Sequence, residues 1–176
     1  KLETVCTHCI QTRRSGVLHV ESDRGDWADL HLNMGRVERV QLQMADATVP
    51  AVGGKKCFFR VIGWPGGVYS FQSRSADPEG GSPVVGESDI LLALALEERD
   101  NLAELSAHVP ARNAVIKAVH PLETLLSELS AEALDTFQKV YNMGVVSQVV
   151  DASDSTDLET YTDLLYLLQN GYLTLE

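Results

Sequence analysis

Residues 16–37 read GVLHVESDRGDWADLHLNMGRV, and this stretch decides the fold of the first half of the chain. Apolar Leu18 and Val20 alternate with polar neighbours, as in a strand with one buried face. The DRGD sequence at 23–26 and the NMG sequence at 33–35 are typical of tight turns between antiparallel strands. The side chains expected on the buried face of the second strand are Ala28, Leu30, Leu32 and Met34. The alternation continues beyond the second turn, so we predict a meander of three strands.

Helical patterns flank this meander on both sides. Apolar residues recur every three or four positions at the start of the chain and again in the segment 53–63. The apolar positions are Leu2, Val5, Cys6, Cys9 and Ile10 in the first helix and Cys57, Phe58, Val61 and Ile62 in the second. The WPGG sequence at 64–67 ends the second helix, and the segment 68–71 follows as a closing strand. We therefore expect an α+β domain in which helices flank a small meander sheet.

A turn-rich segment separates this part from the rest of the chain. Residues 73–86 read SRSADPEGGSPVVG, with two prolines, three glycines and almost no apolar periodicity. Such a composition does not sustain a helix or a sheet and is typical of a linker between folded units. We therefore predict a first domain at 1–75, a linker at 76–87 and a second domain at 88–176.

The second domain is predicted to be mainly helical. Helices are expected from Ser88 to Leu105, from Ser130 to Gly144, from Val145 to Ala152 and from Thr156 to Asn170. Thr156 and Glu159 form the capping-box pattern, in which each side chain accepts a hydrogen bond from the backbone N–H of the other residue. A short strand from Tyr172 to Leu175 completes the domain. Three helices followed by a strand resemble a winged-helix core whose wing is missing or shortened.

Net charge is distributed unevenly along the 176 residues. The whole chain carries a formal charge of −11, with 14 lysines and arginines against 25 aspartates and glutamates. Residues 1–86 hold 10 basic and 9 acidic side chains, whereas residues 87–176 hold 4 basic and 16 acidic ones. Phosphate backbones and anionic lipids are bound by basic surfaces, so we expect neither nucleic acid nor a membrane as a partner.

The composition also limits the class of protein. With 44% hydrophobic side chains, the chain is apolar enough to fold, which excludes a wholly disordered protein. No apolar run approaches the roughly 20 residues of a membrane-spanning helix. The sequence begins at Lys1 instead of methionine, and no basic-then-apolar leader follows, so we expect a fragment or a processed chain.

Cys6 and Cys9 form a CxxC motif, with His8 between them and Cys57 as the third cysteine of the chain. Such a pair serves as a redox dithiol or as half of a zinc site. Both cysteines, however, lie on the apolar face of the first predicted helix, where free cysteine behaves as a small hydrophobic residue. We therefore favour core packing and keep a zinc- or thiol-dependent protein as an alternative. Three reduced cysteines are typical of a cytoplasmic protein.

Motifs of the common catalytic classes are missing from the sequence. It contains no GxSxG, P-loop, GxGxxG or HExxH pattern. His19 and His31 lie on neighbouring predicted strands, but no third metal ligand accompanies them. We therefore expect a protein that is not an enzyme and that carries no cofactor and no metal.

The winged-helix pattern suggests DNA binding, and the charges argue against it. The helix in the recognition position, residues 157–170, carries Asp157, Glu159 and Asp163 and neither lysine nor arginine. A helix that reads bases needs basic or amide side chains at base edges and cations beside phosphates. We therefore interpret this helix as a surface that docks a basic protein partner, and we keep a winged-helix transcriptional regulator as an alternative.

Three segments of the first domain resemble the PATAN domain, a bacterial family associated with response regulators. They read RRSGVLHV at 13–20, ADLHLNMGRV at 28–37 and GWPGGVYSF at 63–71, so the resemblance covers the predicted first domain. The family pattern contains a K/R-x-G-x-L strand, an L-x-F-x-x-G-x-I/V hairpin and a W-x-x-G-x-F-x-F strand. Leu32 replaces the common aromatic residue of the hairpin. Val40 and the GGKK sequence at 53–56 also depart from the pattern.

The resemblance implies a signalling accessory without established catalytic residues. We therefore predict a non-enzymatic, cytoplasmic bacterial adaptor that acts by protein–protein interaction in a two-component or small-GTPase-linked pathway. Its expected partner is a receiver domain, a kinase or a Ras-like GTPase system. The predicted docking residues are Trp64, Val68 and Tyr69 in the first domain and Asp157, Glu159 and Asp163 in the second. Two alternatives stay open: Trp64 seals the core beside the Pro-Gly turn, or an exposed sheet edge pairs two copies as a homodimer.

Overall fold

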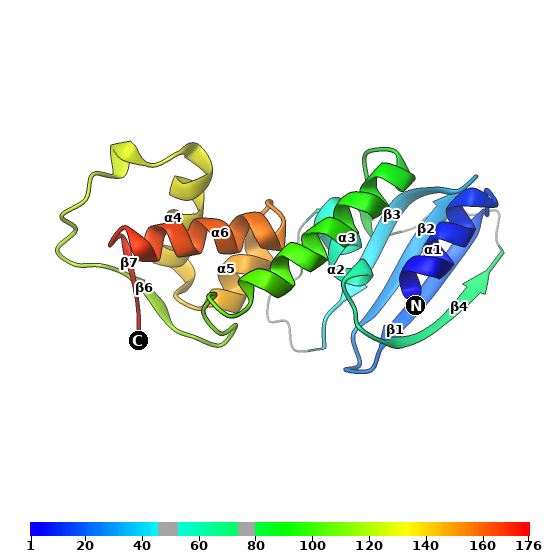
Figure 1. The fold of residues 1–176 in the computed structure, drawn as a ribbon, viewed down its shortest axis with the longest axis horizontal. Coiled ribbons are helices and arrows are strands. Elements are labelled where there is room, and N and C mark those ends of the chain that lie inside the picture. The colour runs from blue at the N-terminus through cyan, green and yellow to red at the C-terminus, as the bar shows by residue number, and fades with distance from the viewer. Residues whose placement is uncertain (46–52, 74–79) are drawn as a thin grey trace. The chain divides into compact units, whose positions relative to one another are not determined.

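The computed structural model describes residues 1–45, 53–73 and 80–176, and it is an α+β structure, as the sequence predicts (Figure 1). The chain divides into two compact units, with the boundary between Asp100 and Asn101. The first unit combines helices with the larger sheet, and the second is mainly helical.

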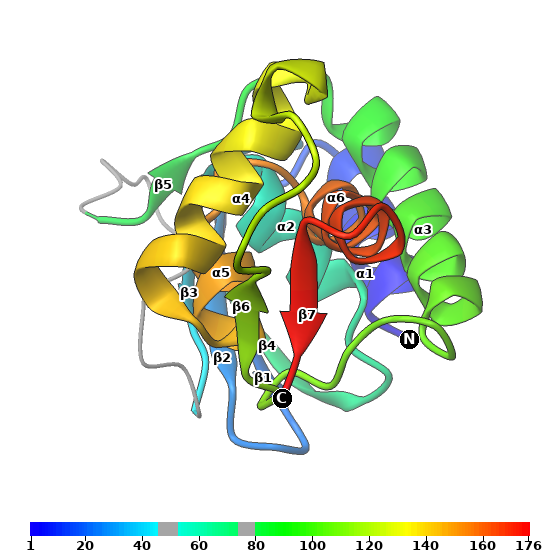
Figure 2. The same cartoon turned by 90° about the vertical axis from the view of Figure 1, so that its left-hand side faces the viewer.

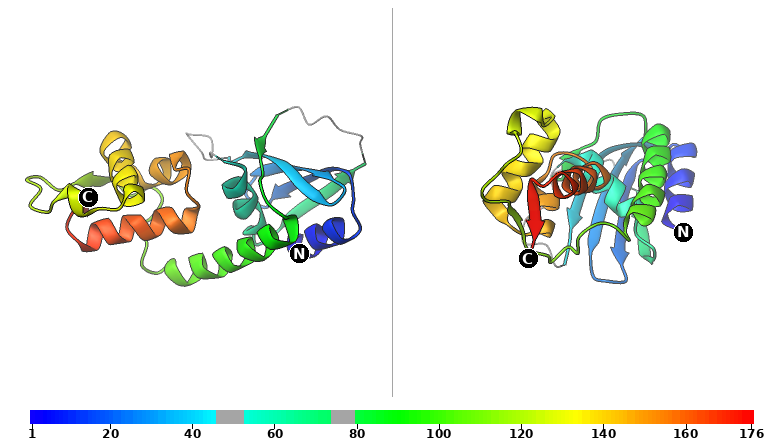
Figure 3. Two further views of the ribbon diagram at one scale, coloured as in Figure 1. Left: turned by 90° about the horizontal axis from the view of Figure 1, so that it is seen from above. Right: turned by 60° about the vertical axis from the view of Figure 1, so that its left-hand side comes forward.

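The first unit is built on a five-stranded antiparallel sheet with the strand order β4-β1-β2-β3-β5. Its strands are β1 (Gly16–Ser22), β2 (Trp27–Asn33), β3 (Arg36–Gln43), β4 (Gly67–Gln72) and β5 (Ser82–Pro83). The predicted meander forms the centre of this sheet, and β4 pairs with β1 at its edge. The helices α1 (Leu2–Gln11) and α2 (Gly54–Ile62) and the first part of α3 (Ser88–Leu105) pack on one face of the sheet (Figure 3).

A β-bulge in β3 explains why Val37 and Val40 are both buried although they are three residues apart. In a regular strand such residues point to opposite faces, because successive side chains alternate. The register between β2 and β3 shifts at this point, so Glu38 is an extra residue on β3. The carbonyl of Glu38 accepts a hydrogen bond from the backbone N–H of Val84 at 2.8 Å. The bulge therefore also attaches the segment that follows β5.

The core of the first unit joins the inner face of the sheet to the three helices. Leu18, Leu30 and Phe58 are fully buried in it. Burying an apolar side chain of this size contributes roughly 1.5–3 kcal/mol. Cys6 and Cys9 pack in the same core from α1, in agreement with the apolar stripe of the sequence.

The second unit combines three helices with a two-stranded sheet (Figure 2). Its elements after α3 are β6 (Ile116–Ala118), the 3₁₀ helix η1 (Leu126–Glu128), α4 (Ala131–Met143), α5 (Val146–Ala152), α6 (Asp157–Gln169) and β7 (Leu173–Leu175). The predicted order of three helices and a final strand is present. β7 pairs with β6, which precedes the helices and which the sequence pattern does not reveal.

Two helices of this unit begin as their sequences predict. Ser130 caps α4, because its Oγ accepts a hydrogen bond from the backbone N–H of Ala133 at 3.2 Å. Thr156 and Glu159 form the capping box of α6, with Glu159 Oε2 accepting from Thr156 N at 2.8 Å. Gly144 ends α4 with a φ of 72°, a left-handed conformation that glycine adopts at little cost.

The predicted linker at 76–87 is in part a strand. Ser82–Pro83 form β5 and pair with β3, and Val84 follows as a buried residue of the core. Residues 76–79 of the predicted linker lie outside the described residues. A strand of two residues has no periodicity that a sequence pattern can reveal.

Helix α3 corrects the predicted start of the second domain at residue 88. The part of α3 up to Asp100 belongs to the first unit, because Leu91 and Ala95 are buried in the core of that unit. The pattern predicts that Ser88 caps this helix. Its Oγ instead accepts a hydrogen bond from the backbone N–H of Val37 at 2.8 Å, which ties the start of α3 to β3.

The buried faces of two helices agree only in part with the predicted ones. The periodicity favours burial of Ile90, Leu91, Leu94 and Ala95 in α3 and of Leu134, Phe137 and Tyr141 in α4. Leu91, Ala95 and Phe137 are buried as predicted, whereas Ile90, Leu94, Leu134 and Tyr141 are exposed. An apolar run such as ILLALAL contains overlapping helical stripes, so its period alone does not select the stripe that faces the core.

Candidate functional site

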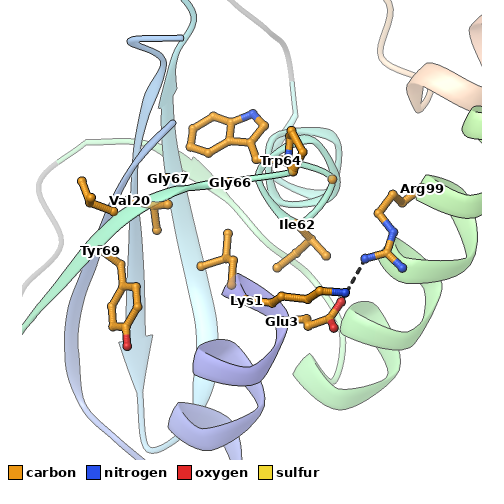
Figure 4. A pocket seen from close by; sticks show the side chains of 13 residues that line it. Lys1, Glu3, Val20, Ile62, Trp64, Gly66, Gly67, Tyr69 and Arg99 are labelled. Carbon is orange, nitrogen blue, oxygen red and sulfur yellow. Dashed lines mark hydrogen bonds and ion pairs between the residues drawn. The ribbon is translucent and has the colours of Figure 1, made fainter. Parts of the chain in front are cut away.

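A pocket of about 270 Å³ lies in the first unit, where the turn after α2 leads into β4 (Figure 4). Trp64, Val68 and Tyr69, the docking residues predicted for the first domain, all line this pocket. Leu2 and Ile62 add apolar surface from α1 and α2. The structure therefore brings the predicted residues of the first domain together.

One wall of the pocket is charged. Arg99 on α3 donates a hydrogen bond from Nη1 to Glu3 Oε2 on α1 at 2.9 Å, drawn as a dashed line in Figure 4. Lys1 lines the same pocket. Arg99 also pairs with Asp100 at 2.9 Å, so its charge is balanced by two carboxylates. The pocket thus combines an aromatic and apolar wall with an ion-paired corner.

Sequence reasoning found the aromatic wall and missed the charged one. Glu3 and Arg99 are 96 positions apart in the chain and meet only because α1 and α3 pack on the same sheet. A pair of distant opposite charges leaves no local pattern. The sequence predicts the two helices that carry Glu3 and Arg99, but it does not predict that these helices lie side by side.

Trp64 lies both at the edge of the core and in the wall of the pocket. Its side chain is half-buried and packs against the core of the first unit. The same side chain lines the pocket. Sealing the core and forming a pocket wall are therefore compatible at this position.

Gly67 allows β4 to approach β1 closely. Its φ is 148°, and a Cβ atom at this position would lie 2.2 Å from the carbonyl oxygen of Glu21 on β1. The pairing that follows places Tyr69 opposite Val20, a core residue that also lines the pocket. Gly67 thus sets the start of the strand that carries Val68 and Tyr69.

β4 is an edge strand, and no described residue pairs with its outer side. Its sequence, GVYSFQ, has no charge, and Val68 and Tyr69 are 66% and 57% exposed. Edge strands are usually protected by lysine, proline, a bulge or a covering segment. The β3 edge of the sheet is covered by β5, which contains Pro83. β4 shows none of these devices within the described ranges.

The side chain of Arg14 lies at the C-terminal end of β4, where its Cζ is 5.9 Å from the centroid of the Phe71 ring. Arg13 is exposed, takes a left-handed conformation with a φ of 51°, and lies close to Gly35 in the turn between β2 and β3. Neither arginine forms an ion pair with a described residue. This end of the strand is therefore electropositive.

The acidic residues predicted to dock a partner on the second unit are involved in the structure of α6. Glu159 belongs to the capping box, and Asp163 Oδ2 accepts a hydrogen bond from Thr136 Oγ1 at 3.1 Å, which links α6 to α4. Asp157 is the first residue of α6 and is half-buried. Reversing the charge of Glu159 or Asp163 would therefore disturb the packing of α6 as well as any docking.

We expect Asp163→Asn to stabilise the second unit at neutral pH. Burial raises the pKa of Asp163, the hydrogen bond from Thr136 lowers it, and nearby carboxylates on α4 and α6 raise it further. The folded state then holds the proton more tightly than the unfolded state, so stability falls as the pH rises from the ordinary aspartate pKa to the raised one. After solvent screening, the expected gain at neutral pH is about 0.5 kcal/mol.

Urea unfolding measures this gain, which should vanish at a pH of about 3, below the ordinary aspartate pKa. Asp154→Asn, at an exposed position, is the matched control and should change nothing. A gain that is equal at neutral and acidic pH would contradict the prediction.

Burial makes the cysteines of α1 poor nucleophiles. Desolvation, with a smaller contribution from Cys9, raises the pKa of the Cys6 thiol to about 12. Desolvation also raises the pKa of Cys9, although the nearby Arg14 lowers it. Reactive cysteines have a lowered pKa, because the thiolate is the attacking form. The environment of Cys6 and Cys9 is therefore that of packed core residues.

Cys6 should resist alkylation by iodoacetamide in the folded protein. With a thiol pKa of about 12, roughly one Cys6 side chain in 10⁴ is ionised at about pH 8, and Cys6 is only 2% exposed. Mass spectrometry after brief exposure should find Cys6 unmodified, whereas the same treatment in urea should modify all three cysteines. Rapid alkylation of Cys6 without denaturant would contradict the prediction.

His19 and His31 lie on neighbouring strands, as the sequence predicts. His19 Nδ1 and Asp29 Oδ1 are 2.6 Å apart, and these residues are directly paired across β1 and β2. Neither ring nitrogen of His31 has a hydrogen-bond partner among the described residues. Across all the residues that the structure describes, no group of three histidine, cysteine, aspartate or glutamate side chains could hold a metal ion.

No family model, curated protein or solved structure matches this chain. The resemblance to the PATAN domain therefore rests on the three sequence motifs and stays a prediction. Across residues 1–45, 53–73 and 80–176, no helix is both long enough and apolar enough to cross a membrane. The pocket and the edge strand β4 are thus the features from which a function can be argued.

Proposed function

We propose that this chain is a non-enzymatic adaptor that binds another protein through the edge strand and pocket of its first unit. The outer edge of β4, with which no described strand pairs, lies beside the pocket at Trp64, Val68 and Tyr69 and carries this proposal. Exposed apolar side chains beside unpaired backbone groups favour binding of another chain. The PATAN resemblance suggests a cytoplasmic bacterial pathway, with a receiver domain, a kinase or a Ras-like GTPase system as partner.

The dimensions of the pocket favour a single partner side chain over a metabolite. Ligand pockets commonly enclose about 300–1,000 Å³, and this one encloses about 270 Å³. Its charged corner is already ion-paired through Glu3 and Arg99. Buried anchor side chains in small apolar pockets supply much of the affinity at protein interfaces. We therefore interpret the pocket as the seat of one apolar anchor residue.

The charges of the second unit disfavour the DNA-binding alternative. Helix α6, Asp157–Gln169, contains neither lysine nor arginine. Lys139 is the one basic residue in the sequence 121–176, and it pairs with Asp135 one turn earlier on α4. A surface of this kind repels the phosphates that supply most of the affinity for DNA. Docking of a basic protein partner remains the role proposed for this unit.

Two variants with the same substitution in the same unit test the proposal. Val68→Lys alters β4 and the pocket, whereas Val85→Lys alters a residue that is 86% exposed and lies outside both. Each serves as bait, beside the unmodified chain, in a crosslinking pull-down from native lysate read by mass spectrometry. We expect Val68→Lys to reduce recovery of the partner about tenfold, as loss of one interface anchor does, and Val85→Lys to leave it unchanged.

Equal recovery with both variants would remove β4 as the docking surface. Recovery of this chain alone, with no other protein, would replace the adaptor role with self-association. Recovery of a receiver domain, a kinase or a GTPase that depends on Val68 would support the adaptor role and name the pathway.

A further inference from the structure

We infer that β4 binds an extended segment of a partner protein as an additional strand of the sheet, with an acidic side chain of that segment beside Arg14. The inference rests on the proposed function, because it names the chemistry of the partner at the same site. Strand addition of this kind takes its affinity from backbone hydrogen bonds and its specificity from alternate side chains.

The backbone of β4 supplies the first part of the argument. Among the described strands, β1 is the one that pairs with the six residues of β4. In an antiparallel pair, alternate residues direct their N–H and C=O groups toward the neighbouring strand, and the residues between them direct theirs outward. Half of the polar backbone groups of β4 therefore face away from β1. An incoming strand would satisfy them without any change in the sheet.

The two faces of β4 define the side chains that this strand needs. Tyr69 and Phe71 lie opposite the buried Val20 and Leu18, so they project on the helical side of the sheet, where the pocket opens. Apolar side chains of the partner fit at the positions that face this side. Val68 and Ser70 project to the other face, opposite Glu21 and His19 of β1, where threonine, with one methyl and one hydroxyl group, fits beside both. The partner segment should therefore alternate apolar and small polar residues.

Charge complementarity places one acidic residue in the partner segment. β4 has no charge of its own, and Arg14 lies over Phe71 at the C-terminal end of the strand. Arg14 forms no ion pair with a described residue. A carboxylate opposite Phe71 would balance its charge. Because antiparallel pairing is the more stable arrangement, this carboxylate belongs near the N-terminal end of the segment.

The other end of β4 disfavours an acidic residue. Val68 is paired with Glu21 of β1, which is exposed, and the carboxylate of Asp23 lies beside Gly66. A second carboxylate there would meet like charge. The distribution of charge along β4 therefore selects the direction of the bound segment as well as its composition.

The probe is a fluorescein-labelled peptide, Thr-Glu-Thr-Phe-Thr-Val-Thr-Gly, titrated with the whole chain and followed by fluorescence anisotropy. We expect saturable binding that weakens about tenfold when lysine replaces the glutamate, the loss of one charge-assisted contact. Arg14→Glu should reverse this preference in favour of the lysine peptide. Arg36→Glu, at an exposed residue of β3, is the matched control and should not. An unchanged preference in Arg14→Glu would overturn the charge assignment.

Backbone methylation tests strand pairing directly. Two versions of the peptide carry N-methyl groups on alternate residues. The first version is methylated along one edge of the extended chain and the second along the opposite edge. Strand addition predicts that one version loses binding and the other keeps it, because only one edge faces β4. Equal behaviour of the two versions would overturn strand addition. The adaptor proposal would still stand if Val68→Lys abolished partner recovery, so the two failures are distinguishable.

A second copy of this chain is the competing occupant of β4. Sedimentation equilibrium of the unmodified chain and of Val68→Lys decides between them. If the unmodified chain and Val68→Lys are both monomers, the result supports a segment of another protein as the occupant of β4. A dimer that Val68→Lys dissociates and that the peptide does not would overturn the inference in favour of self-pairing.

Discussion

Gly67→Ala is expected to detach the start of β4 and to abolish binding at the pocket. A Cβ atom at Gly67 would lie 2.2 Å from the carbonyl oxygen of Glu21 and 3.1 Å from the Cα of Ser22. Both atoms belong to the backbone of β1, so they cannot turn aside as a flexible side chain does. Together with the strain of a φ of 148°, this contact should lower the free energy of unfolding of the first unit by about 3 kcal/mol.

Tryptophan fluorescence during urea unfolding isolates this effect, because both tryptophans, Trp27 and Trp64, lie in the first unit. Gly25→Ala is the matched control. Gly25 also has a positive φ, of 86°, but its Cβ would meet nothing closer than Ala45 at 4.0 Å. The control should lose about 1 kcal/mol from backbone strain alone. Equal losses in Gly25→Ala and Gly67→Ala would show that β4 does not approach β1 as the structure has it.

The strands of the meander could be predicted from the sequence because their signals are local. Alternation from Val17 to Leu32 and the turn residues between the strands determine both the strands and their antiparallel order. The capping box at Thr156 and Glu159 is local in the same sense, and the structure confirms it. Features that a few neighbouring residues decide are thus readable without a structure.

Features that depend on contacts between distant segments could not be predicted. The bulge at Glu38 becomes evident only when the register of β2 and β3 is known. The assignment of α3 to the first unit follows from the packing of Leu91 and Ala95 against a core made by other elements. Periodicity predicts the helix, but the position of a neighbouring core selects the face that becomes buried.

The candidate site likewise contains residues that the sequence predicts and residues that it does not. Trp64, Val68 and Tyr69 stand out in the sequence because these aromatic and apolar residues flank a Pro-Gly turn. Their assembly into one pocket with Glu3 and Arg99 depends on the packing of α1 and α3. Local patterns therefore identify the strand that carries the proposed docking surface, whereas the charged corner of the pocket requires the structure.

In the second unit, Arg112→Leu should cause the largest loss of stability. Asp151 on α5 is 2% exposed, and both of its carboxylate oxygens accept hydrogen bonds from Arg112 Nη2 at 3.1 Å. The carbonyl oxygen of Arg112 also accepts a hydrogen bond from the backbone N–H of Ser147 at 2.8 Å, so this pair fixes the loop before β6 against α5. Removing the guanidinium from a buried carboxylate should cost about 3 kcal/mol.

Far-UV circular dichroism during urea unfolding measures this loss, with tryptophan fluorescence as the reference for the first unit. Lys117→Leu is the matched control, because Lys117 pairs with Glu176 where both side chains are more than half exposed. An exposed pair contributes at most about 1 kcal/mol. In the double variant Arg112→Leu/Asp151→Asn, part of the stability should return, since the buried side chain that has lost the guanidinium is then neutral. Equal losses in Arg112→Leu and Lys117→Leu would mean that α5 is held by its apolar contacts alone.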